Sequence, residues 1–121
     1  MTIILVNLGE WMAKERTYSR YTREAATLLA KQIQLGRKQR KWTEHDLADR
    51  AGISRATLQK IEKGDLSVAL GLVFEVAALV GVALFDEGRG SLASHIARAD
   101  DKLALLPSAV RRGRKPVDDE F

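Results

Sequence analysis

Apolar residues recur at steps of three and four over most of the chain, the spacing that places side chains on one face of an α-helix. From Arg23 to about Arg40 this face carries Ala26, Leu29, Ile33 and Gly36. Similar runs predict a helix after Thr43, one over Arg55–Lys63, one over Val68–Val80, and one that carries Leu92, Ile96, Ala99, Leu103 and Leu106. The pattern therefore predicts an all-α fold.

Residues at the predicted helix ends favour caps and turns. Thr43 can accept a hydrogen bond from the backbone N–H three residues on, and Asp46 can reach back to the cap. Gly52 takes the positive φ of a tight turn at little cost, and Ser54 can cap the helix that follows. The region from Thr43 to Glu62 is therefore expected to hold two short helices joined by a sharp turn.

The Val68–Val80 helix, which Ser67 is expected to cap, is apolar nearly all round. Its core face is expected to hold Leu72, Val73, Val76, Ala77 and Val80, with Val82, Leu84 and Phe85 folding back over the core. Apolar surface then remains on its other faces, at Leu70, Phe74 and Leu79. Such surface needs a cover, and we expect a second copy of the chain and the helix at Leu92–Leu106 to supply it. That last helix should end at Pro107, and the sequence does not decide whether it is broken near Asp100. The protein should be a homodimer.

Two short helices that cross at a tight turn need particular residue types at fixed positions. The crossing requires a small residue, here Ala48, and the turn requires Gly52. Apolar residues must hold the pair against the core, and these are Ile53, Leu58 and Ile61. All five positions carry the required residue type, so the segment Thr43–Glu62 is predicted to be a helix-turn-helix. Trp42, just before it, is expected to pack over the core as a lid.

The polar face of the Arg55–Lys63 helix suits contact with DNA. Its exposed residues are predicted to be Arg55, Ala56, Thr57, Gln59 and Lys60. Arginine, lysine and glutamine donate hydrogen bonds to base edges, and a bidentate arginine–guanine contact discriminates by roughly 1–3 kcal/mol. Thr43 and Ser54 precede helix N-termini, which favour phosphate. For an isolated helix a generic solvated face would be the better interpretation, but behind this turn we favour DNA contact.

The segment Leu47–Gly64 resembles the Cro/C1-type helix-turn-helix family of phage repressors and bacterial regulators, and the resemblance extends over about Arg23–Phe85. It implies a five-helix, lambda-repressor-like domain that binds a palindromic operator as a dimer. It places Arg55, Ala56 and Lys60 where the family reads bases, with Thr57 and Gln59 close by. It places Thr43, Glu44 and Ser54 where the family touches phosphate. Glu44 departs from the glutamine common at its position, and a carboxylate cannot donate to phosphate, so it is expected only to stabilise its helix N-terminus.

The same resemblance pairs Arg37 with Glu62 as a partly buried ion pair that would clamp the first helix to the third. Two independent surface charges are the alternative interpretation. Removing one partner of a buried pair would leave the other charge without compensation.

A second resemblance concerns partners. The segments Ser67–Gly71 and Leu106–Arg112, followed by the ending Asp118–Phe121, are similar to HipB-like antitoxins. This resemblance implies repression of the protein's own operon and binding of a HipA-type kinase toxin. A protein-interaction module with little or no DNA binding is the alternative function.

Length and charge limit the remaining interpretations. The chain has 121 residues and a formal net charge of +4, with basic clusters at Arg37–Lys41 and Arg111–Lys115 that suit a phosphate backbone. We divide it into an N-terminal extension (1–22), the helix-turn-helix domain (23–87), a C-terminal helical extension (88–107) and a flexible tail (108–121). Residues Thr2–Val6 are interpreted as a strand paired across a dimer, as a disordered segment, or as lying before a natural start at Met12.

Composition argues against several other classes of function. The chain has no cysteine, which suits a reducing cytoplasm and leaves no cysteine zinc site. Its two histidines, His45 and His95, have no ligand spacing, and no nucleophile–base constellation or phosphate-binding loop is present. The apolar run Val68–Phe85 contains Glu75, a costly residue within a bilayer, which argues against a membrane span. We therefore expect no enzyme activity, no metal and no cofactor.

Overall fold

The computed structural model describes residues 16–85, 88, 90–110 and 112, and these contain five helices and no strand. The chain divides between Leu84 and Phe85 into two compact units. The first holds α2 (Arg20–Gln39), α3 (Glu44–Ala51), α4 (Arg55–Glu62) and α5 (Leu70–Leu79), and the second holds α6 (Leu92–Ala104). The predicted all-α fold is confirmed.

The caps of α3 and α4 form as the sequence predicts. The Thr43 side chain accepts a hydrogen bond from the Asp46 backbone N–H at 3.0 Å, and the Asp46 carboxylate accepts one from the Thr43 N–H at 2.9 Å. Ser54 accepts a hydrogen bond from the Thr57 N–H at 3.0 Å. Between the two helices, Gly52 adopts φ +71°, a left-handed backbone conformation that residues other than glycine rarely adopt. These contacts fix where each short helix begins and how sharply the chain turns.

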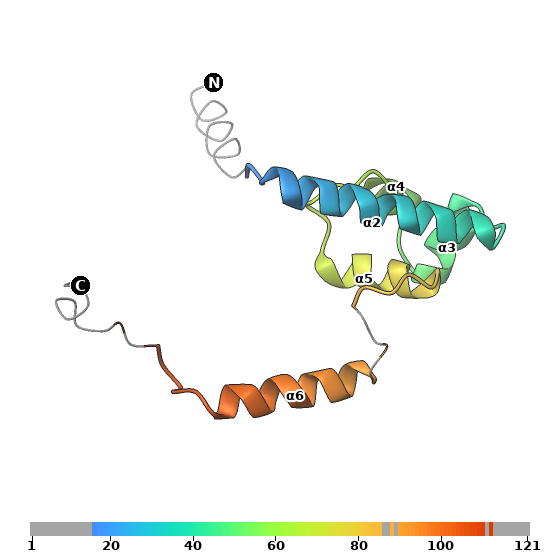
Figure 1. Ribbon diagram of the computed structural model, residues 1–121. Helices are drawn as coiled ribbons and strands as arrows, with labels where there is room; N and C mark the ends of the chain where they lie inside the picture. Colours follow the sequence, from blue (N-terminus) through green and yellow to red (C-terminus); the bar gives the residue numbers. More distant parts are fainter. Residues whose placement is uncertain (1–15, 86–87, 89, 111, 113–121) are drawn as a thin grey trace, which may run out of the picture. The chain divides into compact units, whose positions relative to one another are not determined.

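One apolar core holds the first unit together. Side chains from all four helices form it: Ile33, Leu47, Ala48, Leu58, Ile61, Val76, Ala77 and Val80. α3 packs against α4 and α5, and α4 packs against α2 (Figure 1). Gly36 permits a close approach between α2 and the end of α5, because a Cβ at its position would lie 2.7 Å from the Val80 carbonyl oxygen. Trp42 packs against this core as expected, and the Arg50 guanidinium lies 4.2 Å from the centroid of its ring.

Several predicted boundaries and faces were wrong. α2 begins at Arg20 rather than Arg23, because Ser19 accepts a hydrogen bond from the Thr22 backbone N–H. The last residues of the predicted extension 1–22 therefore belong to α2. Residues 1–15, which include Thr2–Val6 and Met12, lie outside the described residues.

Ser67 does not cap α5, which begins later, at Leu70. The Asp65 carboxylate accepts hydrogen bonds from both the N–H and the hydroxyl of Ser67, at 2.8 and 2.6 Å, and so holds the serine in a local turn.

The faces of α5 match the prediction at Val73, Val76, Ala77 and Val80, which pack on the core, and at Leu70 and Phe74, which are exposed, but not at two leucines. Leu79 packs on the core, whereas Leu72 is exposed. Val82 and Leu84 pack on the core as predicted, but Phe85 is exposed and belongs to the second unit.

The second unit is built around α6. Ser91 caps it by accepting a hydrogen bond from the Ser94 backbone N–H, and the helix continues through Asp100 without a break. It ends at Ala104, before Pro107. Among the described residues, no helix combines the length and the apolar character needed to cross a bilayer, and no three metal-ligating side chains lie together.

Candidate nucleic-acid interface

α4 has one face locked into the core and one face turned to solvent. Leu58 and Ile61 are buried, and Arg55, Ala56 and Lys60 are exposed. Thr57 and Gln59 are half-buried and flank the exposed face. A rigid helix that presents an arginine and a lysine outward is a suitable element for reading base edges in a major groove.

A buried ion pair joins the C-terminal end of this helix to α2. The Arg37 Nε donates to one carboxylate oxygen of Glu62 at 2.7 Å, and one terminal nitrogen donates to the other oxygen at 3.0 Å. The remaining terminal nitrogen donates to the Trp42 carbonyl oxygen at 3.1 Å. The bond to Glu62 raises the pKa of Arg37, which stays charged. The pair that the resemblance implied is therefore present, and Arg37 is not available to contact phosphate.

Glu44 links the N-terminus of α3 to the exposed face of α4. Its Oε1 atom accepts a hydrogen bond from the Gln59 Nε2 at 3.1 Å and lies 3.7 Å from a terminal nitrogen of Arg55. The Gln59 bond, with the charges of Arg37 and Arg55, holds the pKa of Glu44 below its ordinary value despite some desolvation. Glu44 is thus a charged acceptor that orients two candidate base-reading side chains, a role that its place at a helix N-terminus did not indicate.

The two capping hydroxyls differ in what remains for a phosphate. Thr43 uses its oxygen to accept the Asp46 N–H, so its own hydroxyl hydrogen can still donate outward. The Ser54 hydroxyl donates to the Thr57 oxygen at 2.9 Å, which leaves the Thr57 hydroxyl to donate outward. Thr43 and Thr57 are therefore the better hydroxyl donors to a phosphate oxygen, together with the N–H groups at the two helix N-termini.

The sequence did not predict two residues that support the helix-turn-helix, Gln34 and Arg50. Gln34 donates to the Glu62 backbone carbonyl at 2.6 Å, which adds a second link between α2 and α4. It lies one turn before Arg37 on the same helix face, and this spacing could have suggested the link. The Arg50–Trp42 contact carried no comparable signal, because it joins a helix to the loop before its own N-cap.

Comparison with known proteins supports this geometry. A family model for helix-turn-helix domains matches residues 33–86, which include both short helices and the turn. A protein of Methanocaldococcus jannaschii, named as an uncharacterised HTH-type transcriptional regulator, is 43% identical over 44 residues, which cover 36% of this chain and 67% of that protein. The chain belongs to the helix-turn-helix family. No solved structure matches the chain at a significant level.

Family membership indicates the general role of the protein. The Cro/C1-type resemblance is confirmed, and the chain is a DNA-binding regulator of transcription by family. The roles of individual residues, from Thr43 to Lys60, remain predictions that rest on the exposure and contacts given above. The HipB-like ending at Asp118–Phe121 lies outside the described residues.

Proposed function

We propose that this helix-turn-helix protein is a sequence-specific repressor that binds a palindromic operator as a homodimer in the cytoplasm and represses its own operon. The observation that carries the proposal is the two-sided character of α4. Its apolar side and Glu62 are fixed to the core, while Arg55, Ala56 and Lys60 face outward. A helix held in this way can enter a major groove without rearrangement, and the N-terminus of α3 then lies where a helix-turn-helix domain meets the DNA backbone.

Each candidate residue has a separate part in this proposal. Arg55 and Lys60 donate to base edges, and Ala56 leaves room for a thymine methyl group. Gln59 contributes less directly, because Glu44 holds its amide nitrogen. The hydroxyls of Thr43 and Thr57, together with the N–H groups that follow Thr43 and Ser54, contact phosphates and set the register of the helix on the duplex.

The test is the binding of upstream genomic DNA, measured by fluorescence anisotropy over a range of salt concentrations. Lys60→Ala should lose preference for the operator over random DNA, and Lys31→Ala is its matched control. Lys31 is also an exposed lysine, but it belongs to α2, outside the helix-turn-helix. The control should keep the preference. Equal affinity of the unmodified protein for operator and random DNA would contradict the proposal and favour a protein-interaction module.

An antitoxin role extends this proposal to a second partner. The HipB-like resemblance implies that the protein neutralises a HipA-type kinase toxin as well as repressing its operon. Co-purification with a kinase-like protein encoded beside this gene would support that role, provided that the interaction is lost when 117–121 are deleted. Undiminished binding after the deletion would show that the tail is not the contact.

A further inference from the structure

α6 exposes an apolar face along its whole length. Leu92, Ile96 and Leu103 are 44, 61 and 64% exposed, and no residue of the helix is buried. A helix of 13 residues is marginal in water when no tertiary contact buries its apolar side. This face therefore needs a covering surface.

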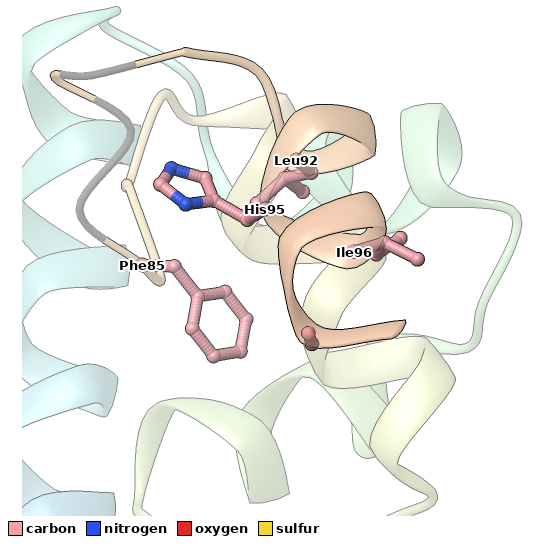
Figure 2. A pocket seen from close by; sticks show the side chains of 5 residues that line it. Phe85, Leu92, His95 and Ile96 are labelled. Atoms are coloured by element: carbon pink, nitrogen blue, oxygen red, sulfur yellow. The ribbon is translucent and has the colours of Figure 1, made fainter. Parts of the chain in front are cut away.

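The spacing on this face is that of a helix pairing with a helix. Leu92, Ile96, Ala99 and Leu103 follow one another at steps of four, three and four, which is the a/d pattern of a coiled coil. The first three also line a pocket of about 480 Å³ with Phe85 and His95, whose rings lie beside α6 in Figure 2. The apolar face of α6 is therefore open to a side chain of a facing helix.

Charges beside the seam indicate what covers it. At 100° per residue, Lys102 lies beside one edge of the apolar face and Asp100 beside the other, whereas Arg98 lies farther round, on the outward side. When two such helices pair in parallel, the basic edge of each faces the acidic edge of the other. An antiparallel pair would place basic edge against basic edge. The pattern is thus complementary to itself in the parallel orientation, which favours a second copy of this chain.

We propose that α6 is a dimerisation element that pairs in parallel with α6 of a second copy through Leu92, Ile96, Ala99 and Leu103. This inference rests on the proposed function, since it supplies the contact between the two copies that bind a palindrome. A pair shorter than two heptads buries little surface and associates weakly. A palindromic operator strengthens the association, because a dimer engages both half-sites at once.

Two leucines at the C-terminal end of α6, two positions apart, give a matched pair of variants. Leu103 lies in the seam, whereas Leu105 lies outside it and is 85% exposed. In the absence of DNA, we expect Leu103→Lys to weaken self-association by about tenfold or more, because it places two ammonium groups in the seam. Leu105→Lys should leave it unchanged. Analytical ultracentrifugation from micromolar to submillimolar protein measures both, with circular dichroism to show that helix content is retained.

A cysteine variant tests the orientation, because the chain has no cysteine of its own. Leu92→Cys should form a disulfide between copies on mild oxidation, since a parallel pair brings the two thiols together at one end. Ala97→Cys, on the outward side of the helix, should not. Failure of Leu92→Cys to cross-link, or cross-linking by both variants alike, would overturn the parallel pair.

The outcomes separate this inference from the proposed function. The α6 pair is overturned if the full-length protein stays monomeric from micromolar to submillimolar concentration. It is also overturned if the Leu103→Lys and Leu105→Lys variants associate equally well. Loss of thermal stability in Leu103→Lys with no change in mass would also overturn it, by showing that α6 is covered within one chain. A dimer that shows these variant effects but has no DNA sequence preference would leave the pair standing and contradict the repressor proposal.

Discussion

The buried pair of Arg37 and Glu62 gives the sharpest stability prediction. The two side chains are 9 and 6% exposed, and each of two nitrogens of the arginine donates to a different carboxylate oxygen. Arg37→Met removes the cation and leaves the Glu62 carboxylate buried without its partner. Breaking a buried pair on one side costs about 3–5 kcal/mol, which is a large part of the roughly 5–15 kcal/mol that keeps a typical domain folded. We therefore expect Arg37→Met to lower the free energy of unfolding by about 3–5 kcal/mol.

The assay is urea unfolding followed by far-ultraviolet circular dichroism, with two further variants as controls. Arg37→Lys keeps a cation but cannot form the bidentate contact, so it should cost less, about 1–2 kcal/mol. The double variant Arg37→Met/Glu62→Leu buries no charge and should be more stable than Arg37→Met alone. If Arg37→Met costs less than about 1 kcal/mol, or the double variant is no more stable than Arg37→Met alone, the clamp reasoning is refuted.

Three further predictions follow from other contacts. Glu44→Gln keeps an acceptor for Gln59 but removes a negative charge beside Arg55, so affinity for any duplex should rise by about 2- to 10-fold in anisotropy titrations, most at low salt; unchanged affinity would show that the charge does not face DNA. Hydrogen bonds from Thr43 hold the pKa of Asp46 below its ordinary 3.8, so its stabilisation is present above that value and is lost as pH falls through the lower folded-state pKa. Thermal melts from neutral pH down to that range should show Asp46→Asn losing less stability on acidification than the unmodified protein, and equal losses would exclude this contribution. Gly36→Ala should cost about 1–3 kcal/mol in urea unfolding, because the added methyl group meets the end of α5, and an undiminished midpoint would show that the two helices separate easily.

The sequence predicts an element best where the cause is local. The caps at Thr43 and Ser54 depend on residues within one turn, and both form as expected. Ser67 also has a hydroxyl near a helix start, yet that hydroxyl donates to the carboxylate of Asp65, two residues before it, and caps no helix. A hydroxyl near a helix start is therefore a cap only when no nearer carboxylate competes for it.

Orientation is harder to predict when a helix has little polar contrast. α5 is apolar on nearly every side, so its periodicity could not decide that Leu79 packs on the core while Leu72 is exposed. The apolar pattern could not predict the contacts of Glu44 with Gln59 and Arg55 either. They join α3 to α4, and the crossing of the two helices sets the distances between these side chains. Residue types predicted that Arg55, Ala56 and Lys60 would be exposed on α4, but the contacts among the side chains could be seen only in the fold.

The most direct test of sequence-specific recognition by α4 is selection of binding sites from random duplex DNA by the full-length protein. We expect enrichment of a palindrome whose half-sites lie about 10–10.5 base pairs apart, centre to centre, or a multiple of that spacing. We also expect a guanine in each half-site whose enrichment disappears with Arg55→Ala. A random pool that yields no shared motif, or the same motif from Arg55→Ala, would contradict the account.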